Sequence, residues 1–427
     1  MNQPLKIAVA GLGTVGAGAV KALLARKNIL AARAGRPLEV TLLCDRNTAC
    51  LAPFAGIKVA SSLDEIIASD ADVVVELIGG ENGVAVSLVE RALKAGKHVV
   101  TANKAMMARH GASLAALAEA HSVGLKFEAA VAGGIPILKS LRESLFVYGV
   151  SAVRGILNGT CNYILTQMES TGRSFGDVLK DAQRLGYAEA NPTLDVGGGD
   201  TAHKLALLAA LVFGVKPDLD AVAVEGIEQI TPEDIAFARE FGYRIKLLGI
   251  ARQTEEGIDM RVQPTMVAAG TPIADVDGVL NAVVADANEA GPFFFEGRGA
   301  GECPTANAVV ADIVDIARGN IGYPFGVPAS GLATLKQAPG GSTTSAFYVR
   351  VEVRDKPGVL AEIAGCLAKS GVSIESLVQR GRTSDHVVSI VLTTHPTTSS
   401  AVTEALNDVG HLKCVTALPC MMAMEAK

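Results

Sequence analysis

A glycine turn near the start of the chain constrains the fold more than any other feature of the sequence. It follows the apolar run Leu5–Ala10, which predicts a buried strand, and precedes the stretch Thr14–Arg26, which predicts a helix. The turn has the spacing Gly-x-Gly-x-x-Gly, at which backbone N–H groups can approach a pyrophosphate. The expected cofactor contacts of this turn are Gly11, Gly13, Thr14, Val15 and Gly16. Because the turn opens a series of strands and helices, we interpret it as a dinucleotide-binding site rather than a glycine turn that only packs a helix on a strand.

The residues after the turn continue the alternation of strands and helices. Strands are predicted at Leu38–Cys44, Asp72–Ile78 and Lys97–Thr101, and a helix at Val84–Ala95. This order predicts an α/β fold in which a Rossmann-type, doubly wound parallel sheet occupies residues 1–134. The insert Lys27–Pro37 lengthens the first connection, and we expect it to be an extended helix end or a loop.

Two charged residues at the end of the second predicted strand bear on the choice of cofactor. Asp45 is placed where an acidic side chain accepts hydrogen bonds from the adenosine ribose, which favours NAD. Its neighbour Arg46 can instead pair with the 2′-phosphate of NADP. The sequence leaves both cofactors open.

The rest of the chain divides into a mixed domain, a linker and a small C-terminal domain. Residues 135–335 combine helical and β-rich stretches, which predicts an α+β domain for substrate binding and dimerisation. The segment Lys336–Ser345 is rich in Gly, Pro, Ser and Thr and predicts a linker. Residues 346–427 then follow an order close to βαββαβ. Its predicted elements are Phe347–Val353, Gly358–Ser370, Ser373–Gln379, His386–Thr394 and Ser399–Asp408.

Two lysines are placed to exchange a proton with a substrate alcohol, as a dehydrogenase requires. Lys104 follows the predicted strand Lys97–Thr101, at the carboxyl edge of the sheet, where such folds bind ligands. Lys204 follows a glycine turn and begins a very apolar helix. Asp200 precedes Lys204 by four residues, so both lie on one helix face and can touch. Such a pair is commonly a surface ion pair, but the apolar helix that follows, Leu205–Val215, favours a buried position facing a cleft.

Carboxylates also gather just before this helix. Glu189 and Asp195 lie in a loop that contains Gly and Pro. Carboxylates there suit the ammonium group of an amino-acid substrate, whereas an isolated segment of this kind would be a solvated acidic loop. We therefore include both residues in the predicted substrate site.

Composition excludes several other classes of protein. The net charge is −6 and no basic run occurs, which argues against nucleic-acid binding. The longest apolar stretch, Leu205–Val215, is much shorter than the roughly 20 residues that span a bilayer, so we expect no membrane span. The N-terminus lacks the pattern of a signal peptide, which predicts a cytoplasmic protein. Seven cysteines without a CxxC pair indicate reduced thiols rather than disulfides or a zinc site.

Taken together, five motifs resemble those of homoserine dehydrogenase in order and spacing. They are Gly11–Gly16, Thr101-Ala-Asn-Lys104, Gly155-Ile-Leu-Asn-Gly-Thr-Cys-Asn162, Gly186-Tyr-Ala-Glu189 and Asp195–Lys204. The resemblance covers roughly residues 5 to 325. It implies interconversion of L-homoserine and L-aspartate 4-semialdehyde with NADP or NAD, a step in threonine, methionine and isoleucine biosynthesis.

The resemblance also implies roles for individual residues. Lys204 matches the group that donates or accepts the proton, and Lys104 matches a lysine near cofactor and substrate that shares this task. Asp200 matches the carboxylate that orients the substrate, and Glu189 matches the group that holds its amine. Further cofactor contacts match Gly186 and Gly301. A monovalent cation, sodium, is implied at residues that match Glu128, Val131, Gly133 and Ile135, with a structural role.

The C-terminal domain is similar to the ACT domain, a regulatory amino-acid-binding module. The resemblance rests on the segment 354–361 together with the βαββαβ order. It implies an L-threonine effector near Asp355 and Gly358 and assembly into a homodimer or homotetramer. No kinase-like region precedes Leu5, so we expect a monofunctional form.

Two other interpretations compete with this one. ACT-bearing 2-hydroxy-acid dehydrogenases place the glycine turn in mid-chain and use a histidine with a carboxylate, whereas this turn begins at Gly11. A non-catalytic sensor of dinucleotide and amino acid would need the turn and the C-terminal domain but has no use for Lys104 and Lys204. An assay with homoserine separates the three.

Overall fold

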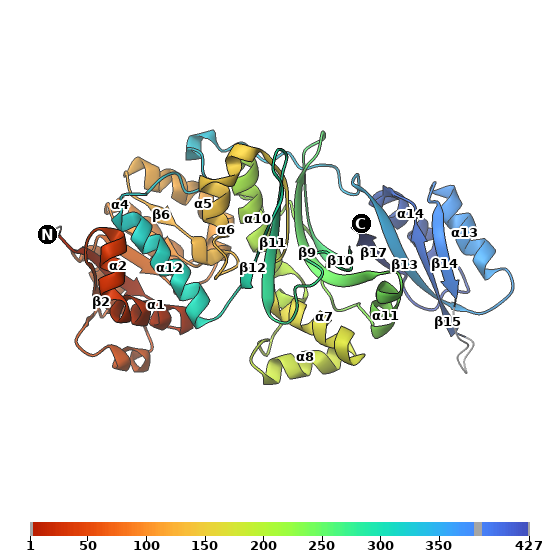
Figure 1. Ribbon diagram of the computed structural model, residues 1–427, viewed down its shortest axis with the longest axis horizontal. Helices are drawn as coiled ribbons and strands as arrows, with labels where there is room; N and C mark the ends of the chain where they lie inside the picture. Colours follow the sequence, from red (N-terminus) through yellow and green to blue (C-terminus); the bar gives the residue numbers. More distant parts are fainter. Residues whose placement is uncertain (1–2, 380–386, 426–427) are drawn as a thin grey trace.

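The computed structural model describes residues 3–379 and 387–425. The molecule is elongated and consists of an N-terminal α/β part, a middle part built on a long sheet, and a C-terminal α/β part (Figure 1). The N-terminus lies at one end, whereas the C-terminus lies between the middle and C-terminal parts. Across the described residues, none of the helices is both long and apolar enough to cross a membrane.

The N-terminal part contains the predicted Rossmann-type sheet. Six parallel strands run in the order β3-β2-β1-β4-β5-β6, which confirms the doubly wound fold class. The strands are β1 (Leu5–Ala10), β2 (Leu38–Cys44), β3 (Lys58–Val59), β4 (Val73–Glu76), β5 (His98–Thr101) and β6 (Leu125–Lys126). All of them point their carboxyl ends to one edge, where the chain turns through Gly11, Asp45 and Lys104.

Helices cover both faces of this sheet. They are α1 (Thr14–Ala25), α2 (Lys27–Ala34), α3 (Leu63–Ala68), α4 (Val84–Lys94) and α5 (Lys104–Ala120), with a 3-10 turn at Thr48–Phe54. The insert after the first helix is neither a helix extension nor a loop: α2 is a separate helix that ends at Gly35 in the left-handed conformation. A late helix, α12 (Glu302–Ala317), returns from the middle part and packs against α1 (Figure 1). Residues on both sides of the predicted boundary at 134 therefore build the N-terminal part.

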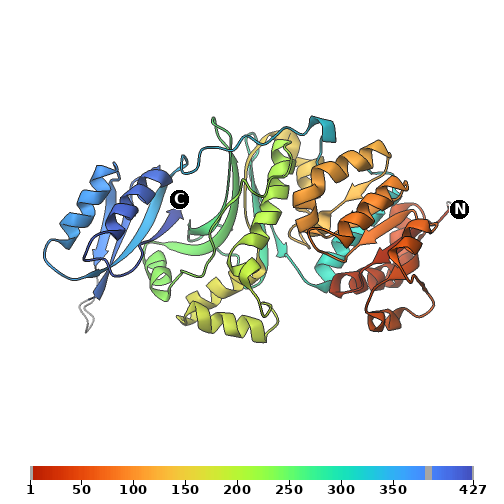
Figure 2. The same ribbon diagram turned by 180° about the vertical axis from the view of Figure 1, so that it is seen from behind.

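The middle part is a mixed α+β domain, as predicted. Its sheet joins β12-β11-β7-β9-β10. The strands are β7 (Val150–Ile156), β9 (Tyr243–Gln253), β10 (Ile258–Ala268), β11 (Leu280–Ala287) and β12 (Gly291–Arg298), with the two-residue β8 (Ala223–Val224) beside β10. The helices are α6 (Ile137–Glu143), α7 (Gly159–Thr171), α8 (Phe175–Arg184), α9 (Thr193–Val196), α10 (Gly199–Phe213) and α11 (Pro232–Glu240). Helix α10 is almost wholly buried and packs against both α5 and β9, so it joins the two parts (Figure 2).

The C-terminal part has the predicted βαββαβ order. Its elements are β13 (Thr344–Arg354), α13 (Val359–Lys369), β14 (Ile374–Gln379), β15 (Val387–Thr394), α14 (Ser399–Gly410) and β17 (Cys420–Met424), with a short β16 (Thr397–Thr398). His386, the predicted start of the third strand, lies outside the described residues. The last strand, β17, lies between β10 and β13 and pairs with both, so the sheets of the middle and C-terminal parts are continuous.

The predicted linker is shorter and more structured than its composition suggests. Thr344 and Ser345 already belong to β13. Upstream, the carbonyl of Lys336 accepts the Ile258 N–H at 2.8 Å, and the Ala338 N–H donates to the Ile258 carbonyl at 3.0 Å. The segment is thus hydrogen-bonded to the start of β10 and is not a free linker.

Candidate active site

A cavity of about 550 Å³ lies where the N-terminal and middle parts meet. Its walls come from the first turns of α5, α7 and α10 and from the loop that leads into α12. The three residues predicted to act in catalysis lie on these walls: Lys104, Asp200 and Lys204. Folding therefore brings together side chains that are separated by a hundred residues in the sequence.

Asp200 is the centre of this arrangement. The residue is 5% exposed and lies in the first turn of α10, where the positive end of the helix dipole favours a negative charge. The Lys104 ammonium lies 3.0 Å from one carboxylate oxygen, and the Lys204 ammonium donates to the other at 2.7 Å. Lys204 also donates to the carbonyl of Leu157 at 2.6 Å. Both lysines are thus fixed with their ammonium groups on one carboxylate inside the cavity.

An asparagine completes the polar floor of the cavity. Asn158 precedes α7, and its side-chain oxygen accepts the Cys161 N–H at 2.8 Å, which caps the helix. Its amide group donates to Asp200 at 2.9 Å and to Asp195 at 2.8 Å. One side chain therefore both begins a helix and holds the two acidic side chains in place.

The two carboxylates respond differently to this environment. Burial favours the neutral form of Asp200, but the Lys204 and Lys104 ammonium groups outweigh it and hold the pKa of Asp200 well below its usual range. Burial raises the pKa of Asp195, with the Asn158 hydrogen bond acting in the opposite direction. Asp200 is therefore the stable anion of the site.

A second groove, of about 730 Å³, adjoins the glycine turn. Gly11 has φ +94°, and a Cβ there would lie 2.5 Å from the Leu77 carbonyl, so only glycine fits. A Cβ on Gly16 would lie 2.0 Å from the Gly11 oxygen, so this residue serves the packing of helix on strand. Gly13 faces open space at the start of α1, which has neither a side-chain cap nor an acidic first turn. The free N–H groups of this helix end suit a pyrophosphate.

Asp45 and Arg46, the residues predicted to bear on the choice of cofactor, both line this groove. One Asp45 oxygen accepts the Leu12 N–H at 2.6 Å and the other accepts the Asn47 N–H at 2.8 Å. Asp45 therefore holds the glycine turn in shape as well as facing the groove. Arg46 is exposed on the rim.

The other predicted contacts divide between the cavity and the surface. Val15, Gly186, Asp195 and Gly301 line the cavity. Thr14 is exposed at the start of α1. Glu189 is exposed and is not among the described residues that line the cavity, although its near neighbour Tyr187 is.

Comparisons with known proteins agree with this geometry. The family described as "Homoserine dehydrogenase, NAD binding domain" matches residues 11–128, "Homoserine dehydrogenase" matches residues 136–314, and "ACT domain" matches residues 347–411. The homoserine dehydrogenase of Neisseria gonorrhoeae is 42% identical, with 99% of each chain covered. The chain belongs to the homoserine dehydrogenase family.

Other members of the homoserine dehydrogenase family support the same assignment. The Pseudomonas aeruginosa homoserine dehydrogenase is 41% identical, with 95% of each chain covered. The crystal structure of a homoserine dehydrogenase from Thiobacillus denitrificans matches with a TM-score of 0.94 at 42% identity, covering 99% of both chains. The chain is therefore an NAD(P)-dependent oxidoreductase with a C-terminal ACT domain, and the non-catalytic sensor is not supported.

The site that the resemblance to homoserine dehydrogenase assigns to a cation lies beside the cavity. The Glu128 carboxylate is buried and accepts the N–H groups of Leu138 and Lys139 at 2.9 and 2.8 Å. Burial raises the pKa of Glu128 to about 7, and the neighbouring Asp312 carboxylate adds to this. Next to it the backbone turns sharply, with Ala132 at φ +51°, a conformation that non-glycine residues adopt at cost. One buried carboxylate beside a strained turn with backbone carbonyls suits a hard monovalent ion.

The sequence carries no clear signal for several residues that line the cavity. Asn158 lies within one of the matched motifs, but in the sequence an asparagine before a helix looks like any other N-cap. Asn281 and Arg298 also line the cavity, from β11 and the end of β12. Their positions depend on strand pairing over long sequence distances, for which the sequence carries no local signal.

Proposed function

We propose that the cavity binds L-homoserine or L-aspartate 4-semialdehyde with the reacting oxygen between Lys104 and Lys204. The bridge that Asp200 makes between the two ammonium groups, at 3.0 and 2.7 Å, is the observation that carries this proposal. In the direction of reduction, Lys204 donates a proton to the aldehyde oxygen as it becomes the hydroxyl. In the direction of oxidation, the amine accepts that proton. The nicotinamide, when bound, supplies or accepts the hydride.

Each charged group has a separate part in this mechanism. Asp200 keeps both lysines in the cavity and stays negative, so its charge offsets part of the positive charge of the two ammonium groups. Lys204 is the principal proton carrier in this proposal, because its side chain is 12% exposed, against 34% for Lys104, and it has a second fixed partner in the Leu157 carbonyl. Lys104 lies nearer solvent, where it can orient the substrate oxygen and share the proton transfer.

The substrate ammonium is assigned to acidic side chains. Asp195 lines the cavity, and its carboxylate accepts a hydrogen bond from Asn158, as the carboxylate of Asp200 does. Glu189 is exposed in the loop that continues from Tyr187, which lines the cavity. In this proposal Glu189 contacts the substrate when the loop closes over it.

An absorbance assay tests the function directly. With L-homoserine and NAD⁺ or NADP⁺, we expect reduction of the nicotinamide, and with 2-hydroxy acids we expect none. Dinucleotide binding without turnover of homoserine would contradict the proposal and favour a sensor. The same assay gives kcat/KM for each cofactor. A higher value with NAD⁺ would indicate that Asp45 selects the cofactor, and a higher value with NADP⁺ would indicate Arg46.

We propose that sodium binds between Glu128 and the backbone carbonyls of Val131, Gly133 and Ile135, in a structural role. The Glu128 pKa of about 7 is above the ordinary value, so the folded protein holds a proton there between roughly pH 4.5 and 7 that the unfolded chain releases. Sodium must displace this proton. Its effect on stability should therefore be larger above pH 7 than below.

Thermal unfolding measures this effect. Replacing tetramethylammonium chloride by sodium chloride at equal ionic strength should raise Tm by about 2–4 °C at pH 8, and by less at pH 6. Glu128→Gln keeps the shape of the side chain but removes its charge, and it should abolish the sodium effect. An equal effect of sodium on both proteins would contradict the site.

The ACT domain is the proposed site of feedback. A cavity of about 470 Å³ lies at its first turn, lined by Asp355, Gly358 and Gln379 among others. We propose that L-threonine binds there and lowers the activity, which addition of L-threonine to the same assay tests. We further propose a cytoplasmic homodimer or homotetramer, in which thiols such as Cys161 and Cys366 stay reduced, and light scattering measures its size.

A further inference from the structure

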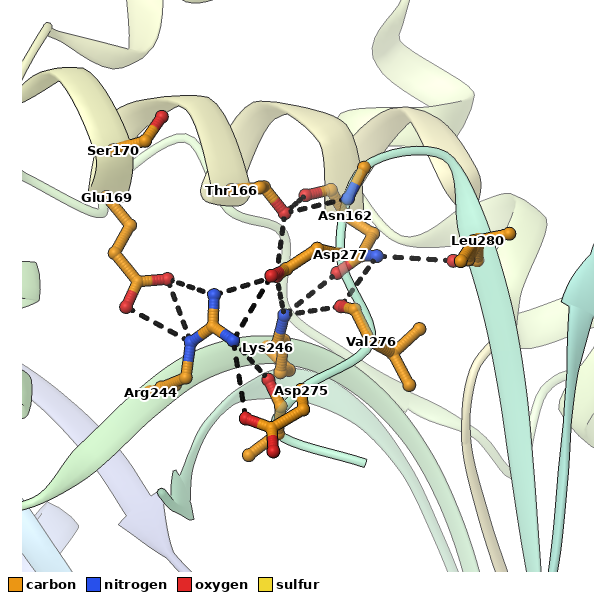
Figure 3. Close-up of polar contacts among 12 residues, drawn as sticks. Asn162, Thr166, Glu169, Ser170, Arg244, Lys246, Asp275, Val276, Asp277 and Leu280 are labelled. Atoms are coloured by element: carbon orange, nitrogen blue, oxygen red, sulfur yellow. Dashed lines mark hydrogen bonds and ion pairs between the residues drawn. The ribbon is translucent and has the colours of Figure 1, made fainter. Parts of the chain in front are cut away.

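A buried lysine that takes no part in the chemistry lies beneath α7. Lys246 is on β9 and its side chain is 1% exposed. Its ammonium donates to the Val276 carbonyl at 2.6 Å and to the Asn162 side chain at 3.4 Å, and it lies 3.3 Å from Asp277 (Figure 3). Burying an ammonium costs several kcal/mol before its partners compensate, and an apolar side chain of similar length would fill this space without that cost. The position of the charge therefore calls for an explanation beyond packing.

Lys246 belongs to a network that attaches the segment 276–280 to α7. The Asn162 amide donates to the carbonyls of Val276 and Leu280 at 3.1 and 3.2 Å. The Gly278 N–H donates to the Thr166 hydroxyl at 3.2 Å. As Figure 3 shows, the lysine reaches up from the sheet between the helix and this segment, so its ammonium contacts both.

The same segment forms one wall of the substrate cavity. Val279 lines the cavity and contacts the first turn of α7, where a Cβ on Gly159 would lie 2.8 Å from the Val279 carbonyl. Asn158 directly precedes this turn, and its side-chain amide donates to Asp195 and Asp200. The distance between this wall and the acidic floor is therefore set by how firmly the segment is held on the helix.

We propose that Lys246 is a positioning residue for the homoserine dehydrogenase reaction. Its ammonium fixes the segment 276–280 against α7 and so sets the width of the cavity between Val279 and Asn158, to suit a small amino alcohol or aldehyde. The inference rests on the proposed function, because the substrate is the one assigned above. Lys246 acts through Val276 and Asn162, without contact to the substrate.

Arg244, on the same strand, also contacts the segment 276–280, through Asp277, but it connects the segment to the other end of α7. It pairs with Glu169 at 2.6 Å and with Asp277 at 2.7 Å (Figure 3). Glu169 lies near the end of α7 that points away from the cavity. Arg244 thus attaches the far end of the helix, and Lys246 attaches the part nearer the substrate.

The test compares Lys246→Met with Lys97→Met. Lys97 is also buried and donates to two backbone carbonyls, of Ser69 and Ala71 at 2.7 and 2.8 Å, but it lies before β5, at the amino end of the parallel sheet. Both variants replace a buried ammonium with an apolar side chain of similar length, so a change in thermal stability that they share reports this replacement and not the position of the lysine. Lys246→Met alone should raise KM for homoserine about tenfold, with a smaller change in kcat and unchanged cofactor affinity.

A second readout does not depend on turnover. In the substrate-free protein, amide hydrogens of the segment 276–280 should exchange faster with solvent in Lys246→Met than in Lys97→Met. Unchanged homoserine KM and unchanged exchange in this segment, relative to Lys97→Met, would overturn the inference. If the wild-type protein does not oxidise homoserine, the proposed function fails, and the exchange measurement still decides whether Lys246 holds the segment.

A milder pair of variants covers the case in which Lys246→Met does not fold. Thr166→Val removes the hydroxyl that accepts the Gly278 N–H and should raise KM for homoserine about threefold. Thr171→Val, on the same helix, removes a surface hydroxyl that donates to the Gln167 carbonyl and accepts the Arg173 N–H, and it should leave KM unchanged. Equal KM values for the two threonine variants would also overturn the inference.

Discussion

Lys204→Met should lower kcat for homoserine oxidation by about 10² or more, the scale expected for loss of a positioned acid–base group. The methionine fills the same space beside Leu157 but cannot donate or accept a proton. Since Asp200 keeps Lys104 as a partner, the floor of the cavity should stay formed. Steady-state kinetics with either nicotinamide cofactor measure the effect.

Two controls make the Lys204 result specific. Cofactor affinity should not change, because the groove at the glycine turn is lined by other residues. Lys104→Met should have the smaller effect on kcat and the larger effect on KM, if Lys104 mainly orients the substrate. Unchanged turnover in Lys204→Met would contradict the role of Lys204 as proton carrier. A greater loss of kcat in Lys104→Met would indicate that Lys104 carries the proton instead.

The second large effect concerns the attachment of the ACT domain. Asp234, in α11, is completely buried and accepts hydrogen bonds from Arg350 at 2.7 Å and from the Tyr348 hydroxyl at 2.8 Å, both on β13. Asp234→Ala leaves the Arg350 guanidinium with only the more exposed Glu352 carboxylate as an acidic partner, and it should lower the free energy of unfolding by about 3–5 kcal/mol. Urea denaturation followed by circular dichroism measures this change.

The neighbouring residue provides the control. Glu233 is exposed, and within the described part of the ACT domain it hydrogen-bonds to the Ser389 hydroxyl at 2.8 Å. Glu233→Ala should change the free energy of unfolding by less than about 0.5 kcal/mol. If both variants unfold at the same urea concentration as the wild type, the buried contact between α11 and β13 does not stabilise the protein.

The fold could be predicted from the sequence where the signals are local. The glycine turn at Gly11, the strand Leu38–Cys44 and the βαββαβ order after residue 346 follow from hydrophobic periodicity and turn residues within short windows. The packing of α12 on α1 could not be predicted, because it joins residues almost three hundred positions apart. The separate helix α2 was also missed, because the break at Arg26 has no Gly or Pro to mark it.

The active site was predictable to a similar extent. Asp200 and Lys204 share a helix face by their spacing, and Lys104 was placed by the rule that parallel strands end at a common edge. The sequence predicts Asn158 only as a helix cap, because the cap is a local feature. Its hydrogen bonds to Asp195 and Asp200 join distant residues and have no local signal. The exposure of Glu189 depends on the path of a loop, which composition does not define.

The position of β17 has a practical consequence for any attempt to remove the ACT domain. Deleting the tail would remove the strand that pairs on one side with Thr265 and Met266 of β10 and on the other with β13. Two unpaired strand edges would then face solvent, and such edges invite aggregation. Point substitutions around Asp355 and Gly358 would leave these strand pairs intact, so they are the safer way to alter the proposed effector site.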